Sequence, residues 1–147
     1  MEIFQIDDDG RLFISPAIED WNSVSAYGID VVIDLDGGLD TCIPAIPNHC
    51  VYVYFLINDD DEALPSLIKL RAIARMAAEL IAGGHRVLSH CGLGFNRSAL
   101  MAGLILTELG MTGADALSRL RERRAGALYN EMFATFLESV GVIPSGA

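Results

Sequence analysis

Residues 86–109 hold the pattern that most restricts how this chain can fold: a short apolar strand, a loop with two glycines, and a helix. Val87 and Leu88 predict the strand, and the apolar run from Ala99 to Leu109 predicts the helix. Between them lies the segment HCGLGFNRS, residues 90–98. This order places Cys91 at the end of a buried strand and Arg97 at the N-terminus of a helix.

Strand-like and helix-like segments alternate along much of the chain. Val31–Leu35 and Val51–Ile57 are continuous apolar runs, and the second is predicted to be a strand buried on both faces. Helical spacing of apolar residues predicts helices over residues 65–82, 97–109, 112–124 and 130–140. The alternation predicts one α/β domain, residues 1–147, with a mostly parallel central sheet of about four to five strands flanked by helices.

Two local signals mark the N-terminal part. Ile3–Ile6 and Arg11–Ile14 flank the turn-forming residues 8–10, which predicts a hairpin. Ser15-Pro16 has the form of a helix start, with serine as the N-cap and proline in the first turn. We therefore expect a helix from this point to about Tyr27.

The charge of the chain limits its partners. The formal net charge is -10, which disfavours nucleic acids, because they bind basic surfaces. No apolar stretch reaches the roughly 18 residues that a membrane span needs. The acidic N-terminus lacks the pattern of a secretory signal. We expect a cytoplasmic protein with no membrane span and no nucleic-acid partner.

The three cysteines, Cys42, Cys50 and Cys91, are an odd count without a C-x-x-C pair, which is typical of reduced thiols rather than a disulfide framework. The sequence lacks zinc-site spacing, so neither a metal nor a cofactor is predicted. Cys42 and Cys50 are interpreted as core or loop thiols. The alternative is that one of them traps an oxidised Cys91 as a disulfide.

The segment around Cys91 combines the parts of an oxyanion site with a sulfur nucleophile. Free N–H groups at a helix N-terminus favour a thiolate over a thiol, and the loop amides can surround phosphate oxygens. Arg97 offers a planar fork for two oxygens, which lysine lacks. Ser98 can donate a hydrogen bond to the sulfur, and His90 can hold the loop. Hydrolysis of a phosphate monoester is the leading activity that needs these parts together.

These residues form one candidate site. The candidate catalytic residues of the loop are Cys91, Arg97 and Ser98, and the candidate substrate-binding residues are Gly92, Leu93, Gly94, Phe95, Asn96 and Arg97. The alternative is that Cys91 is a small buried core residue without chemistry.

Phosphate ester hydrolysis also needs a proton for the leaving oxygen. Asp59, Asp60 and Asp61 follow the run Val51–Ile57, and a carboxylic acid on a loop beside the pocket can supply that proton. Asp59 is the first candidate and Asp60 the second. The alternative is a solvated acidic turn.

The pattern His90-Cys91-x-x-Gly94-x-x-Arg97-Ser98 resembles the signature of the cysteine-dependent protein tyrosine phosphatase superfamily. The length of the chain resembles the small dual-specificity branch of that superfamily. Further similar segments cover residues 11–15, 28–35, 57–59 and 124–133.

This resemblance implies a dual-specificity-phosphatase-like fold and a two-step reaction through a phosphocysteine, without a metal or cofactor. Cys91 would attack phosphorus, and Asp59 would protonate the leaving group and then activate water. Arg97 and the loop amides would stabilise the phosphate oxygens. The expected substrates are proteins phosphorylated on tyrosine and on serine or threonine, or a small phosphate ester.

Asn96 departs from this branch, which more often carries serine, glycine or threonine there. Phe95-Asn96-Arg97 is similar instead to the loop of the RNA 5′-triphosphatases of the same superfamily. Two alternatives to a protein phosphatase stay open. One is a phosphatase of a phosphoinositide, a lipid phosphate or an RNA 5′ end, and the other is a phosphate-binding module without turnover.

Arg119, Arg121, Arg123 and Arg124 form a basic helix end in an acidic protein. Cations near a helix C-terminus are favourable in themselves, and this is our first interpretation. The alternative is that Arg123 or Arg124 makes a second anion contact beside the pocket.

Overall fold

A computed structural model describes residues 1–141, so residues 142–147 of the predicted domain lie outside the described residues. Within that range five strands form one sheet in the order β1-β2-β5-β3-β4. The strands are β1 (Phe4–Gln5), β2 (Leu12–Ser15), β3 (Val31–Asp34), β4 (Val51–Tyr54) and β5 (Val87–His90). β1 pairs antiparallel with β2, whereas the other three pairs are parallel. The predicted hairpin and the predicted mostly parallel α/β sheet are confirmed.

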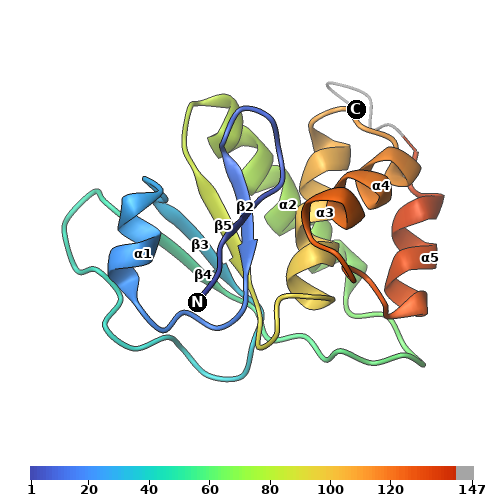
Figure 1. The fold of residues 1–147 in the computed structure, drawn as a ribbon, viewed down its shortest axis with the longest axis horizontal. Helices are drawn as coiled ribbons and strands as arrows, with labels where there is room; N and C mark the ends of the chain where they lie inside the picture. Colours follow the sequence, from blue (N-terminus) through green and yellow to red (C-terminus); the bar gives the residue numbers. More distant parts are fainter. Residues whose placement is uncertain (142–147) are drawn as a thin grey trace.

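Helices cover both faces of the sheet (Figure 1). The helix α1 (Trp21–Ala26) lies on one face, and α2 (Leu67–Ala82), α3 (Arg97–Glu108), α4 (Gly113–Arg123) and α5 (Glu131–Ser139) lie on the other. Successive strand residues alternate between these faces. The larger core contains Leu12, Ile14, Val31, Ile33 and Val87, and the smaller core contains Phe13, Val32 and Leu88.

The helix α3 is the centre of the larger layer. Every residue from Ser98 to Thr107 is buried, because α3 packs against β2 and β5 and also contacts α2, α4 and α5. A helix that is apolar on all sides fits such a position. Its N-terminus is thereby fixed at the end of β5.

Among the described residues, none of the helices combines the length and the apolar character that a membrane span requires.

The helix predicted to begin at Ser15 is wrong. Ser15 ends β2 and pairs with His90 of β5, and α1 begins only at Trp21. The chain between them stays next to the loop that follows β5, where the Ala17 amide donates to the Gly92 carbonyl at 3.3 Å. Pairing with β5 and this contact outweigh the local helix signal.

The prediction that Val51–Ile57 is buried on both faces is also wrong. β4 is an edge strand that ends at Tyr54, and Val51 and Tyr54 are 42% and 40% exposed. An apolar run alone does not distinguish a central strand from an edge strand. In β4 the two tyrosines form hydrogen bonds through their hydroxyl groups. The Tyr54 hydroxyl accepts a hydrogen bond from the Gly38 amide at 3.0 Å, which ties the edge strand to the loop after β3.

Candidate active site

The loop between β5 and α3 lies at the carboxyl ends of the parallel strands β2, β5 and β3. This is the edge at which α/β sheets commonly bind ligands. We call residues 91–97 the cysteine loop. Asn96 is the N-cap residue of α3 and Arg97 is the first residue of that helix, so the predicted strand–loop–helix order is confirmed.

The carbonyl oxygens of the cysteine loop are engaged on its outer side. The contacts are Ala17 N to Gly92 O (3.3 Å), Arg124 Nη2 to Leu93 O (3.4 Å), Arg124 Nε to Gly94 O (3.5 Å) and Leu128 N to Phe95 O (2.8 Å). In a planar trans peptide the N–H points opposite to the C=O. The four amides from Leu93 to Asn96 therefore point to the inner side, and none of them donates a hydrogen bond to any described residue. Converging free amides of this kind form a cradle for an anion.

Gly94 allows the loop to pass close to β2. Its φ angle is +74°, and a Cβ at this position would lie 2.8 Å from the Pro16 nitrogen and 2.9 Å from the Ser15 carbonyl carbon. Both the left-handed conformation and the contact with rigid backbone exclude a larger residue. The predicted need for a glycine in the loop therefore has a geometric basis at Gly94.

Cys91 and Ser98 lie together at the base of the cradle. The Cys91 sulfur is 3.4 Å from the Ser98 hydroxyl oxygen, and the two residues are 2% and 0% exposed. The Ser98 carbonyl accepts a hydrogen bond from the Ser89 hydroxyl at 3.0 Å, which holds the first turn of α3 against β5. The Ser98 hydroxyl is thus within reach of a sulfur anion at Cys91.

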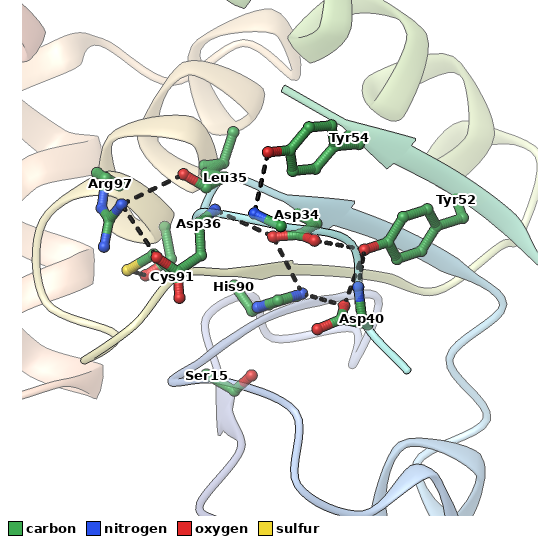
Figure 2. Close-up of polar contacts among 12 residues, drawn as sticks. Ser15, Asp34, Leu35, Asp36, Asp40, Tyr52, Tyr54, His90, Cys91 and Arg97 are labelled. Atoms are coloured by element: carbon green, nitrogen blue, oxygen red, sulfur yellow. Dashed lines mark hydrogen bonds and ion pairs between the residues drawn. The ribbon is translucent and has the colours of Figure 1, made fainter. Parts of the chain in front are cut away.

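One edge of the Arg97 guanidinium is bound by the protein. Its Nη1 atom lies 3.4 Å from the Leu35 carbonyl and 3.3 Å from Asp36 Oδ1 (Figure 2). The same atom lies 3.3 Å from the Ile57 carbonyl. Its Nη2 atom lies on the loop side, 3.3 Å from the position that a Cβ of Gly92 would occupy. Within residues 1–141 the Nε and Nη2 atoms of Arg97 have no hydrogen-bond partner. This edge can bind two oxygens of a tetrahedral anion.

Sequence reasoning missed Asp36, whose carboxylate pairs with Arg97. The signal was available, because Asp36 follows β3 at the same edge of the sheet as Cys91. Its Oδ2 atom would be 3.4 Å from a Cβ at Gly92, so the carboxylate lies beside the cradle. Asp36 holds the arginine in place, although its own charge also opposes an incoming anion.

The three acidic candidates have different surroundings. Asp59 faces the cysteine loop: its Oδ2 accepts a hydrogen bond from the Asn96 side chain and its Oδ1 accepts one from the Asn130 side chain, both at 2.8 Å. The Asp60 side chain turns back to its own loop, where it accepts a hydrogen bond from the Glu62 amide at 2.8 Å. Asp61 is exposed and has no hydrogen bond within the described part of the chain. Of the three, Asp59 contacts the cysteine loop.

A cavity of about 580 Å³ adjoins this acidic loop and the start of α5. It is lined by Asp59, Asp61, Asn96, Tyr129, Asn130, Glu131 and Met132. Asp59 is therefore accessible from solvent through this cavity.

His90 holds the loop after β3 rather than the cysteine loop. Its Nε2 atom lies 2.7 Å from Asp40 Oδ2 and 3.7 Å from Asp34 Oδ1 (Figure 2). The Tyr52 hydroxyl donates to Asp34 and lies 3.1 Å from Asp40 Oδ2. Burial, and then the hydrogen bond to Asp34, raise the pKa of Tyr52. The expectation that His90 fixes the loop is corrected: the imidazole is part of a polar network behind Cys91.

Asp34, Asp40 and His90 form the grouping among the described residues that could hold a metal ion, since their donor atoms lie within 4.8 Å of one another. Each of the three already has a hydrogen-bond partner in the network with Tyr52. The donor atoms of this grouping are thus engaged with protein groups, while the buried Nδ1 atom of His90 has no partner among the described residues.

The arginines at the end of α4 contact protein groups. Arg123 pairs with Asp8 at 2.6 Å, and Arg121 donates to the carbonyls of Ala127 and Leu128 at 3.2 and 3.0 Å. The Arg124 guanidinium lies between two aromatic rings, 4.4 Å from the Phe4 centroid and 3.9 Å from the Phe95 centroid. The second anion contact considered for Arg123 or Arg124 has no support in this arrangement.

No protein-family model matches the sequence, and no curated protein matches it. Solved structures, in contrast, are similar over almost the whole chain. The Yvh1 phosphatase domain from Chaetomium thermophilum is 20% identical, with a TM-score of 0.75 and coverage of 93% of this chain and 94% of that one. Human DUSP28 is 18% identical, with a TM-score of 0.74 and coverage of 92% and 90%. Tk-PTP in its active form is 26% identical, with a TM-score of 0.69 and coverage of 92% and 95%.

The similarity covers 92% to 93% of this chain in all three structures. It agrees with the resemblance that residues 90–98 carry in the sequence. The chain therefore has the fold of the small, cysteine-dependent dual-specificity phosphatases.

Proposed function

We propose that this chain is a cysteine-dependent phosphatase that hydrolyses phosphate monoesters through a phosphocysteine intermediate. One observation carries the proposal. Four consecutive inward-facing amides, the Cys91 sulfur and the unpartnered edge of the Arg97 guanidinium all belong to one seven-residue loop. Amides and a guanidinium are sufficient to bind an anion. A sulfur nucleophile beside that anion is needed only if the sulfur attacks it.

In the first step the Cys91 thiolate attacks phosphorus. A sulfur–phosphorus bond forms, the bond between phosphorus and the ester oxygen breaks, and Asp59 gives its proton to that leaving oxygen. The inward amides and the Nε–Nη2 edge of Arg97 stabilise the three equatorial oxygens of the phosphoryl group.

In the second step water attacks the phosphocysteine. Asp59, now a carboxylate, takes a proton from that water as the new oxygen–phosphorus bond forms. The sulfur–phosphorus bond breaks, and the Ser98 hydroxyl donates to the departing thiolate across the 3.4 Å that separates the two atoms. Inorganic phosphate is released, and no metal or organic cofactor takes part in the steps described.

We further propose that the substrates are proteins phosphorylated on tyrosine and on serine or threonine. Leu93 and Tyr129 are 68% and 56% exposed and leave apolar surface beside the loop, which suits an aryl group or a peptide. The net charge of -10 disfavours an RNA 5′ end. The free thiols of Cys42 and Cys50 suit the reducing cytoplasm, where we propose that the protein acts.

The experiment is hydrolysis of 4-nitrophenyl phosphate by the parent protein and by Cys91→Ser. We expect nitrophenol release by the parent, its loss in the variant, and a phosphorylated Cys91 trapped by acid quench and located by mass spectrometry. Cys42→Ser is the matched control, because it removes an exposed thiol that lies outside the cysteine loop. This variant should keep the parent rate. Parent protein that binds vanadate without turnover would contradict the proposal and support a binding module.

A second assay separates the substrate classes. Phosphotyrosine and phosphoserine peptides are compared with a phosphoinositide and with an RNA that carries a 5′-triphosphate. We expect the highest kcat/KM on the peptides. A higher kcat/KM on the lipid or the RNA would contradict the proposed substrate class while leaving the chemistry intact.

A further inference from the structure

Asn96 occupies the N-cap position of α3 but does not cap the helix. Asparagine at this position commonly accepts a hydrogen bond from an amide of the first turn. Here its side chain makes no such bond, and its backbone has φ −112° and ψ −64°. The side chain is used elsewhere, although the residue is only 3% exposed.

Both ends of the Asn96 side chain have partners outside the cysteine loop. Its Oδ1 atom accepts a hydrogen bond from the Asn130 backbone N–H at 2.9 Å, and its Nδ2 atom donates to Asp59 Oδ2 at 2.8 Å. The backbone N–H of Asn130 can only donate, so the orientation of the Asn96 amide follows from its partners. Asn96 thus joins three segments that are distant in the sequence.

The other Asp59 oxygen is held from the side of α5. The Asn130 side chain donates to Asp59 Oδ1 at 2.8 Å and to the Asp60 carbonyl at 2.9 Å, and its own Oδ1 caps α5 through the Phe133 amide at 3.2 Å. Each carboxylate oxygen of Asp59 therefore accepts one amide hydrogen bond. The carboxyl group is fixed relative to the cysteine loop in both position and rotation.

We propose that Asn96 is a positioning residue of this reaction, which ties the proton donor Asp59 to the loop that carries the nucleophile. The proposal rests on the proposed function. Residue 96 is then asparagine, rather than the more common serine, glycine or threonine, because its side chain places the acid. The inward amide of residue 96 belongs to the backbone and does not depend on this side chain.

A positioning role for Asn96 makes its effect dependent on the leaving group. A poor leaving group such as phenoxide needs its proton in the transition state, whereas nitrophenoxide needs it much less. Loss of the Asn96 side chain should therefore lower kcat for phenyl phosphate by about tenfold or more, and for 4-nitrophenyl phosphate by roughly twofold. Vanadate inhibition should stay within about twofold of the parent, because the cradle amides remain.

The experiment is a double-mutant cycle with Asn96→Ala and Asp59→Asn on both substrates. If Asn96 acts through Asp59, Asn96→Ala should change kcat by less than about twofold once Asp59 is asparagine. Asn96→Ser is the second variant, because it keeps a small polar side chain at a buried position. Asn58→Ala is the matched control: Asn58 precedes Asp59, is exposed, and has no hydrogen bond among the described residues. It should keep the parent kcat on both substrates.

The outcomes separate the two proposals. Equal losses on the two substrates, or an undiminished effect of Asn96→Ala in the Asp59→Asn background, would overturn the positioning role and leave the phosphatase assignment standing. Parent protein that binds vanadate but hydrolyses neither substrate would overturn the proposed function and the positioning role together. Vanadate binding by each variant reports that its cysteine loop is folded.

Discussion

At residue 97 the guanidinium is shared between the protein and the proposed substrate. Nη1 is held by two carbonyls and by Asp36, while the opposite edge has no partner among residues 1–141. A lysine has one nitrogen and cannot serve both groups. We predict that Arg97→Lys lowers kcat/KM for 4-nitrophenyl phosphate by about 100-fold or more, which is about 2.7 kcal/mol of transition-state stabilisation. A lysine variant within about threefold of the parent would contradict this division of the guanidinium.

The two thiols outside the cysteine loop, Cys42 and Cys50, should also differ at the residue scale. Burial, and then the charge of Asp30, raise the pKa of the Cys50 thiol, so Cys50 holds a smaller thiolate fraction at neutral pH than an ordinary cysteine. We predict that iodoacetamide at pH 7.5 alkylates exposed Cys42 before Cys50, as followed by peptide mass spectrometry. Faster labelling of Cys50 would contradict the direction of this shift. Cys50 is accordingly the poorer of the two candidates for trapping an oxidised Cys91.

At the scale of elements, the short strand β1 and the end of α4 brace the cysteine loop from outside. Arg124 contacts the carbonyls of Leu93 and Gly94 and lies between the rings of Phe4 and Phe95. We predict that Arg124→Ala lowers the free energy of unfolding by ~2 kcal/mol and weakens vanadate inhibition, because the loop amides lose their fixed direction. Urea unfolding and vanadate titration measure the two effects.

Arg123→Ala is the control for that prediction. Arg123 is the neighbour of Arg124, and it pairs with Asp8, whose side chain is 73% exposed. An exposed pair of this kind contributes about 0–1 kcal/mol. We expect vanadate inhibition at the parent level in Arg123→Ala. Equal weakening in both variants would mean that the basic charge, rather than the bracing contact, matters.

Elements with strong local signals were predictable, and those decided by distant partners were not. The helices of residues 67–82 and 113–123 follow their apolar spacing and their caps, such as Thr112, whose hydroxyl accepts from the Asp115 amide at 3.1 Å. The Ser15-Pro16 signal failed because Ser15 pairs with His90, which lies far along the chain. The edge position of β4 depends on strand order, and no periodicity within the strand records that order.

At the scale of the whole molecule, the candidate site also combines residues from one local segment with residues that only tertiary contacts bring to it. Cys91, Arg97 and Ser98 lie within one contiguous segment, so their spacing alone predicted their common location. Asp36, Asp40 and Asn130 reach the site through the sheet and through α5. Their roles depend on tertiary contacts that the sequence does not display. The resemblance located Asp59 to within a residue or two, and the contacts of its carboxylate distinguish it from Asp60 and Asp61.

The buried polar network behind Cys91 links the active edge of the sheet to global stability. Asp34 is fully buried, and its carboxylate accepts a hydrogen bond from the Tyr52 hydroxyl. The raised pKa of Tyr52 keeps this phenol protonated in the folded protein at a pH where an unfolded tyrosine loses its proton. Folding then binds one proton more than the unfolded state does, so the contribution is complete below about pH 10 and is lost as the pH rises above it.

We therefore predict that the urea midpoint of the parent decreases as the pH is raised from 8.5 to 11. In Tyr52→Phe this decrease should be smaller. The variant should be less stable than the parent at pH 8.5, because Asp34 loses a buried hydrogen bond, so the slope against pH rather than the midpoint itself carries the test. Tyr129→Phe, which removes an exposed hydroxyl, should keep the parent slope. If Tyr52→Phe kept that slope as well, the phenol would be ionising in the folded protein as freely as in the unfolded chain, and its hydrogen bond to Asp34 would not contribute to the pH dependence of stability.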